Sequence, residues 1–164
     1  MSGVQATIKH AEQHCASRGA RLTTKRKRVL SGLLKSKKAM SAYEIADYCK
    51  AEFGDAMPAM SVYRILDFLG EEHLVHKLNS SNKYVACSHI TCEHGHDVTQ
   101  FLICDQCQQV KEINISQSMI EHLRDNMEEA GYHLLSPQLE MKCLCKQCFA
   151  GKVDLTADGT VGLQ

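Results

Sequence analysis

The chain has 164 residues, of which 44% are hydrophobic, so it can bury one good core or two small ones. No stretch approaches the ~18 apolar residues of a membrane span, and the N-terminus lacks the apolar core of a signal peptide, which excludes a membrane protein and predicts a soluble cytoplasmic one. The formal net charge is zero, from 19 Lys and Arg against 19 Asp and Glu, which at first sight argues against nucleic acid as a partner.

The charge is distributed unequally along the chain. Residues 1–82 carry 13 Lys and Arg against 8 Asp and Glu, and residues 83–164 carry 6 against 11, so the halves have charges of +5 and −5. This asymmetry predicts two electrostatically different modules. A phosphate-facing surface and a solvated basic helix face explain the most basic segment about equally well. That segment, residues 21–38, contains no acidic residue, and its basic residues are Arg21, Lys25, Arg26, Lys27, Arg28, Lys35, Lys37 and Lys38.

The first three expected helices follow from apolar periodicity and capping signals. The spacing predicts a helix over about residues 3–18, where a glycine follows, and a second helix that begins near Thr24. The apolar face of the second helix leaves Lys25, Lys27 and Arg28 largely on its opposite, exposed side. Ser41 and Glu44 form an S-x-x-E capping box, which opens a third helix.

A fourth helix is expected to begin at Ser61, which is a suitable N-cap. The apolar residues that follow it fall on one face at helical spacing, so Tyr63 and Arg64 are expected to point outward. An outward pair in the first turn of the second helix of a helix-turn-helix is where side chains read DNA bases. The alternative for Tyr63 is a partly buried packing aromatic.

Two short apolar segments, 74–78 and 83–86, enclose the polar turn 79–82 and predict a β-hairpin. Helices followed by a hairpin form a winged helix, in which the hairpin lies beside the recognition helix. We therefore expect residues 1–82 to be a winged-helix DNA-binding domain.

The second half has the pattern of a small α/β unit, which makes the whole chain an α+β protein. Its small sheet has an edge that pairing with a second copy would protect, so residues 83–150 are expected to form a metal-binding dimerisation domain. The tail 151–164 is rich in small and polar residues and is expected to be disordered. The expected elements are strands over 100–104, 110–115 and 133–142, and a helix over 118–130 capped by Ser118 and Glu121.

Nine cysteines are too many for a cytoplasmic protein unless they bind metal, because disulfides are uncommon in that compartment. Two CxxC motifs, Cys104-Asp105-Gln106-Cys107 and Cys145-Lys146-Gln147-Cys148, together supply the four thiolates of a closed tetrahedral zinc site. One CxxC motif alone is also compatible with redox chemistry, but two in a reducing compartment favour structural zinc.

A second group of metal-ligand residues lies on both sides of the expected domain boundary. Zinc held by these residues would tie the hairpin to the dimerisation half, and the thiolate argues against a hard-ligand iron site. Each residue taken singly is a weak candidate, and the choice between the two histidines of the H-G-H sequence stays open. The group consists of His76, Cys87, His94, His96 and Glu112.

From about Cys15 to Cys148 the chain resembles the ferric-uptake-regulator (Fur) family, and most closely its zinc-type members. One segment, 88–100, does not align without a gap, and Met60 stands where a proline is usual. The matching stretches are Arg21-Leu22-Thr23, Ser41-Ala42-Tyr43, Ser61-Val62-Tyr63-Arg64, Leu66-Asp67-Phe68-Leu69, Val75-His76-Lys77, Tyr84-Val85-Ala86-Cys87, Phe101 to Cys107, Val110-Lys111-Glu112 and Cys145-Lys146-Gln147-Cys148.

The resemblance implies a homodimeric repressor that binds an AT-rich palindromic operator in double-stranded DNA when zinc-loaded and represses zinc-uptake genes. It implies that the four CxxC cysteines hold structural zinc. The sensing ligands are His76, Cys87, Glu112 and either His96, slightly preferred, or His94. Tyr63 and Arg64 match the family's DNA-reading pair.

Other functions remain open at this point. Within the family, an iron- or peroxide-responsive regulator is the main alternative, and Cys87 argues against it. Outside it, a zinc metalloenzyme lacks an evident general base, and four protein ligands leave no position for water. A zinc-stabilised interaction module would leave the basic segment and Arg64 unexplained.

Overall fold

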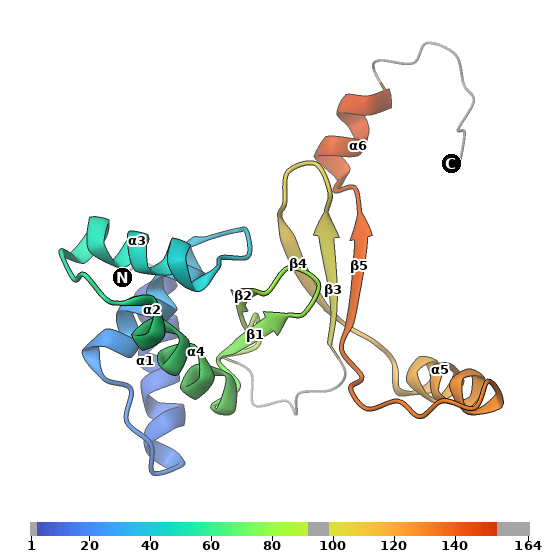
Figure 1. Ribbon diagram of the computed structural model, residues 1–164, viewed down its shortest axis with the longest axis horizontal. Helices are drawn as coiled ribbons and strands as arrows, with labels where there is room; N and C mark the ends of the chain where they lie inside the picture. The colour runs from blue at the N-terminus through green and yellow to red at the C-terminus, as the bar shows by residue number, and fades with distance from the viewer. Residues whose placement is uncertain (1–2, 92–98, 154–164) are drawn as a thin grey trace.

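The computed structural model of the protein describes residues 3–91 and 99–153. The N-terminal helices lie at one side of the molecule and a three-stranded sheet lies at the other, with a small hairpin between them (Figure 1). In chain order the elements are α1 (Gly3–Ser17), α2 (Thr24–Lys35), α3 (Ala42–Phe53), α4 (Ala59–Glu71), β1 (Val75–Leu78), β2 (Lys83–Ala86), β3 (Thr99–Cys104), β4 (Val110–Asn114), α5 (Gln117–Glu129), β5 (Leu139–Cys143) and α6 (Lys146–Val153). None of the helices in the described part of the chain is long and apolar enough to cross a membrane.

Local capping signals set the ends of α2 and α3. Thr23 caps α2 by accepting from the backbone N–H of Arg26. Ser41 and Glu44 form the expected capping box, in which each side chain accepts a backbone N–H of the other residue. Helix α3 ends at Gly54, whose φ of 64° is the left-handed conformation that favours glycine. These helix ends confirm the prediction from sequence.

The N-cap of α4 lies three residues earlier than expected, so the predicted N-cap at Ser61 is wrong. The N-cap is Pro58, whose carbonyl accepts the N–H groups of Ser61 and Val62. The fixed φ of proline is compatible with a helix start, so the helix extends back to it. The phase of the helix is unchanged: Arg64 is exposed, whereas Tyr63 is half-buried and packs against the core, as in the alternative considered for it.

One hydrophobic core unites the four N-terminal helices with the hairpin. Leu30, Ile45 and Leu66 are its large, fully buried side chains from α2, α3 and α4, and Val75 and Tyr84 add the two strands of the hairpin. We call β1, the turn 79–82 and β2 the wing. Its strands pair antiparallel, with Val75 opposite Ala86 and Leu78 opposite Lys83. The domain boundary expected after residue 82 therefore falls inside the wing.

The second sheet has the strand order β4-β3-β5, in which β3 pairs antiparallel with β4 and parallel with β5. The expected strand over 133–142 is wrong for its first part, because β5 begins at Leu139, after a Gly131 with φ of 81° and a Pro137 that has no N–H to donate.

The elements around this sheet differ from expectation at their ends. Ser116, not Ser118, precedes α5, and it makes no side-chain cap, so the predicted cap by Ser118 is wrong. Helix α6 was not expected and includes Gly151, so the tail does not begin there. The rest of the expected tail, 154–164, lies outside the described residues.

Candidate metal centres

The four cysteines of the CxxC motifs form one group in the structure. Cys104 ends β3, and Cys145 follows β5, which pairs with β3 so that Cys104 lies opposite Cys143. Cys107 lies in the turn after β3 and Cys148 in the first turn of α6. Their four Sγ atoms all lie within 4.8 Å of one another, and Cys107 Sγ is 3.8 Å from Cys145 Sγ.

The electrostatics of this group favour a bound cation. Backbone N–H groups of Cys107 and Cys145 lower the pKa of the Cys104 thiol to about 6, and Cys145 N donates to Cys104 Sγ at 3.3 Å. The hydrogen bond with Cys145, burial, and the neighbouring thiols of Cys107 and Cys104 raise the pKa of Cys148 to about 12. Four thiolates at these distances need a compensating cation, and four sulfur donors suit tetrahedral zinc with no open coordination position.

A second group joins the wing to the C-terminal sheet. His76 lies on β1, Cys87 follows β2, and Glu112 lies on β4. Their ligand atoms all lie within 4.8 Å of one another. His76 Nε2 is 3.3 Å from Glu112 Oε1, and Cys87 Sγ is 4.0 Å from the same oxygen. The structure thus brings together three of the residues expected to share a metal ion, whereas His94 and His96 lie outside the described residues.

The second group fits a metal ion because its buried nitrogen has no other partner. Among the described residues, His76 Nε2 is buried without a hydrogen bond, since its close approach to Glu112 Oε1 lacks hydrogen-bond alignment. Burial disfavours the imidazolium of His76, yet Cys87 and Glu112 outweigh it and raise the pKa of His76 to about 9. Burial likewise favours a neutral Glu112, but His76 and Ser88 lower its pKa to about 2. A nitrogen, a sulfur and a carboxylate oxygen that converge in this way suit zinc.

Sequence reasoning missed two residues that contact this group. Ser88 donates to Glu112 Oε2 twice, from its backbone N at 2.8 Å and from Oγ at 2.9 Å. His89 Nδ1 lies 3.2 Å from Glu112 Oε1. The Ser88 contacts hold one carboxylate oxygen and leave the other facing His76 and Cys87. In the sequence, only their position next to Cys87 pointed to Ser88 and His89, because their partner Glu112 is more than 20 residues away.

The residues expected to contact DNA have unequal exposure. Arg21, Lys25 and Arg64 are exposed, and their side chains make no hydrogen bond or ion pair within the described ranges. Arg28 differs: its guanidinium is half-buried and 2.6 Å from Asp55 Oδ2, so the expectation of an exposed Arg28 is wrong. This ion pair ties α2 to the segment between α3 and α4.

The N-terminal half is a winged helix, and its wing carries metal-ligand residues that meet a sheet closed by a four-cysteine group. These features define a metal-binding protein of the winged-helix class. The family model of the ferric uptake regulator family matches residues 17–142, and the chain belongs to this family.

Similar proteins cover most of both chains. The zinc uptake regulation protein of Escherichia coli (strain K12) is 35% identical over 144 residues, which are 88% of this chain and 82% of that protein. A zinc uptake regulator complexed with zinc and DNA is 30% identical, with a TM-score of 0.81 over 93% of this chain and 99% of that one. The holo form of XcZur is 33% identical, with a TM-score of 0.73 over 88% and 98% of the two chains. The apo form of XcZur has a TM-score of 0.50 over 91% and 99%.

Proposed function

We propose that this protein is a zinc-responsive transcriptional repressor that binds operator DNA as a dimer when zinc-loaded and represses zinc-uptake genes. The observation that carries the proposal is the His76, Cys87 and Glu112 group, whose members come from the wing and from the C-terminal sheet. The relatives named as zinc uptake regulators support the same assignment.

The domain arrangement supports a metal-dependent switch. At the same 33% identity, the chain resembles holo XcZur with a TM-score of 0.73 and apo XcZur with one of only 0.50. The higher TM-score with the holo form supports the proposal that this arrangement of winged helix and sheet is the one that metal favours.

The ligands explain how metal would select this arrangement. His76 and Cys87 move with the winged helix, whereas Glu112 moves with the sheet, so sharing one ion requires the two parts to lie together. Zinc, when bound, supplies the cation that this mixed donor set requires. To change a population from 1:99 to 99:1, the ion must prefer the closed arrangement by about 5.5 kcal/mol. Linkage then requires that operator DNA tightens zinc binding in return.

Zinc is a better assignment than iron for this group. The Cys87 thiolate is a soft ligand, which zinc accepts and a hard-ligand iron site does not favour. An iron- or peroxide-responsive regulator is the second candidate, because the chain belongs to a family that is named for ferric uptake.

The DNA surface is assigned to the winged helix. Arg64 lies exposed on α4, and Arg21 and Lys25 lie exposed at the start of α2, where they are available to phosphates or bases. Tyr63, although half-buried, remains in the proposed base-reading pair because it precedes Arg64 in the same turn. The proposed operator is an AT-rich palindrome, whose symmetry matches that of a dimer.

The proposed dimer surface is the apolar part of the C-terminal half. In the single chain, large apolar side chains are exposed there. A second copy of the chain would cover them. These side chains are Met119, Tyr132, Leu135, Met141 and Phe149, with exposed fractions of 59%, 73%, 97%, 52% and 56%.

The decisive test is operator binding across buffered concentrations of free zinc, Fe(II) and Mn(II). We expect binding at trace free zinc and none in chelator, and we expect Arg64→Ala to abolish most binding while the helical circular dichroism stays unchanged. Asp67→Asn, at another exposed position of α4, is the matched control. Activation by Fe(II) or Mn(II) but not by trace zinc would overturn the zinc assignment, and equal zinc affinity with and without operator would overturn the switch.

A further inference from the structure

The wing contacts the C-terminal sheet at a second place, at the end of β1 and in the turn that follows it. The carboxylate of Glu140 on β5 accepts the backbone N–H of Asn79 at 2.6 Å on Oε1 and that of Ser80 at 2.9 Å on Oε2. Gln138 uses its Nε2 to bridge the same place, donating to Lys77 O and to Glu140 Oε1, both at 2.8 Å. Lys77 directly follows the ligand His76, whereas Asn79 and Ser80 lie three and four positions beyond His76, in the wing turn.

The wing turn is suited to this contact. Successive backbone N–H groups in a turn are not used by the strand ladder and form a cradle for an anion. Glu140 places one carboxylate oxygen on each N–H, and these donors lower the pKa of Glu140 although its burial acts the other way. The wing turn is therefore held by an ionised side chain of the other half of the molecule.

We propose that Glu140 is a latch that positions the wing, and with it the recognition helix α4, on the C-terminal half in the DNA-binding arrangement. This inference deepens the proposed function and rests on it. The metal-ligand group would hold the base of the wing through His76 and Cys87, and Glu140 would hold its tip. Two separated attachments fix an orientation, whereas a single attachment leaves the wing free to pivot about it.

The wing transmits this constraint because it is packed rigidly against α4. Val75 and Tyr84 of the wing belong to the same buried core as Leu66 and Leu69 of α4. Leu74 N, just before the wing, donates to Leu69 O at 2.8 Å. The wing and α4 therefore belong to one packed unit, so a contact that orients the wing also orients α4.

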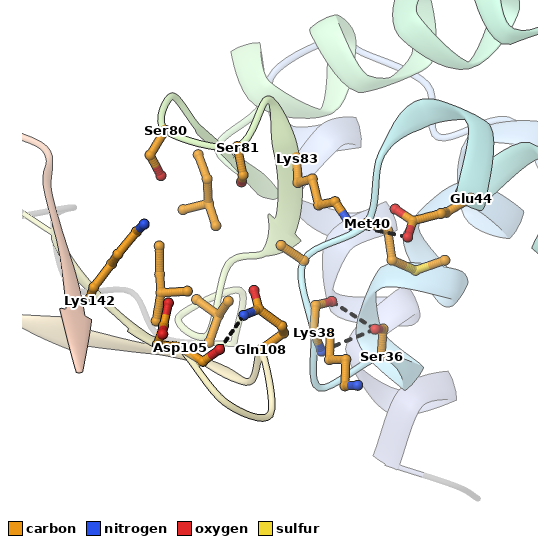
Figure 2. Close-up of a pocket in the computed structure, with 14 residues that line it drawn as sticks. Ser36, Lys38, Met40, Glu44, Ser80, Ser81, Lys83, Asp105, Gln108 and Lys142 are labelled. Atoms are coloured by element: carbon orange, nitrogen blue, oxygen red, sulfur yellow. Dashed lines mark hydrogen bonds and ion pairs between the residues drawn. The ribbon is translucent and has the colours of Figure 1, made fainter. Parts of the chain in front are cut away.

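The wing and the sheet meet through direct contacts, such as that of the His76 and Phe101 rings, whose centroids are 5.3 Å apart, and around an open pocket. A pocket of about 590 Å³ lies between the wing turn, the segment 36–40 and the sheet. Figure 2 shows Ser80 and Ser81 of the wing turn across this pocket from Asp105 and Lys142. Because the interface is open at this pocket, the contacts on either side of the pocket help to hold the two halves in one orientation.

Backbone contacts of the segment 37–40 lie at the other side of the pocket. Met40 exchanges two hydrogen bonds with Tyr84 of the wing, at 3.0 and 2.8 Å, and Val110 N of β4 donates to Lys37 O at 3.2 Å. This segment links wing and sheet through the main chain, so no side-chain substitution removes it. Glu140 is the attachment that a single substitution can test.

The test is amide hydrogen exchange at Asn79 and Ser80, followed by NMR in the full-length zinc-loaded protein. We expect both amides to exchange at least ten-fold faster in Glu140→Gln than in wild type, with the zinc content unchanged. Glu140→Asp keeps the charge but is one methylene too short to reach both donors, and we expect it to lose the protection as well. The matched control is Glu129→Gln, because Glu129 is exposed and makes no hydrogen bond or ion pair in the part of the chain that the structure describes.

Operator affinity at saturating zinc gives the second measurement. We expect Glu140→Gln and Glu140→Asp to weaken operator binding by about ten-fold, and Glu129→Gln to leave it unchanged. Unchanged exchange at Asn79 and Ser80 in both Glu140 variants would overturn the latch. A different result would separate the two proposals. If the amides of Asn79 and Ser80 are protected from exchange in the zinc-loaded wild type but operator binding does not depend on zinc, the proposed function is overturned and the wing contact is not.

Discussion

Glu112 shows how a single carboxylate serves two partners at once. Its Oε2 accepts both hydrogen bonds from Ser88, while its Oε1 lies toward His76 Nε2 at 3.3 Å. Because the two oxygens are held in different surroundings, the carboxylate has one defined orientation toward the proposed zinc position. Residues that orient a ligand in this way commonly affect metal affinity nearly as much as the ligands themselves.

Removing the Ser88 hydroxyl should therefore weaken zinc binding at this group. We expect Ser88→Ala to lower the affinity by about ten-fold, while the backbone N–H of residue 88 keeps part of the contact. Chelator competition that resolves the weaker of the two zinc sites measures the change. Ser81→Ala is the control, since Ser81 is exposed in the wing turn and its hydroxyl has no hydrogen-bond partner among the described residues. Equal affinities in the two variants would contradict the orienting role.

Gly32 is required by the close approach of α2 and α3. A Cβ at this position would lie 2.7 Å from Cδ1 of Tyr48. We expect Gly32→Ala to lower the free energy of unfolding by about 1–3 kcal/mol, because overpacking forces the ring or the helix to move. Denaturant unfolding followed by circular dichroism measures it. Gly70→Ala is the matched control: a Cβ there meets nothing within 4 Å, so alanine should be neutral or stabilising.

At the scale of elements, helix ends follow local chemistry and packing decides the rest. The capping box at Ser41 and Glu44 was predictable because both partners lie within one turn. The start of α4 at Ala59 and of β5 at Leu139 was not, because Pro58 extends the helix and the chain from Gly131 to Pro137 does not pair with β3.

The capping box carries a pH-dependent contribution to stability. Hydrogen bonds from Ser41 lower the pKa of Glu44 despite the opposing effect of its burial, and Lys83 adds to the lowering. The contribution is therefore present above the usual pKa of a glutamate and is lost as pH falls through the lowered value. We expect Glu44→Ala to cost about 1 kcal/mol at pH 7. The difference between variant and wild type, measured by unfolding at several pH values, should shrink under acid, and a constant difference would contradict this account.

The whole molecule depends on two metal-ligand groups with different tasks. The four-cysteine group closes the C-terminal half on itself, because it joins the end of β3 to the start of α6. The His76, Cys87 and Glu112 group joins that half to the wing. Loss of the first group should unfold a domain, and loss of the second should only release the winged helix.

Substitution of one CxxC cysteine separates these tasks. We expect Cys145→Ser to reduce the zinc content by about one ion per chain and to abolish the dimer, because structural zinc supplies folding free energy. Metal analysis and sedimentation measure the two effects. Cys143→Ser is the matched control, since Cys143 Sγ contacts Ile103 O at 3.6 Å and lies outside the ligand group. A dimeric Cys145→Ser protein with full zinc content would contradict the structural role.

The sequence by itself determined the features that arise from neighbouring residues. Helical periodicity, the capping box and the two CxxC motifs all depend on groups within one or two turns, so their chemistry is visible in a short window. The sequence also identified His76, Cys87 and Glu112 as metal-ligand residue types on both sides of the expected domain boundary, and the family resemblance implied that they are sensing ligands.

Only the tertiary structure decided which distant groups meet. No local sequence pattern encodes the packing that half-buries Tyr63 or pairs Arg28 with Asp55. The same is true of the hydrogen bond that Ser88 donates to Glu112. Glu140 reaches the wing turn across about 60 positions of the chain. Such contacts form because parallel pairing of β3 with β5 places that side chain beside the wing, and strand pairing is a property of the folded molecule.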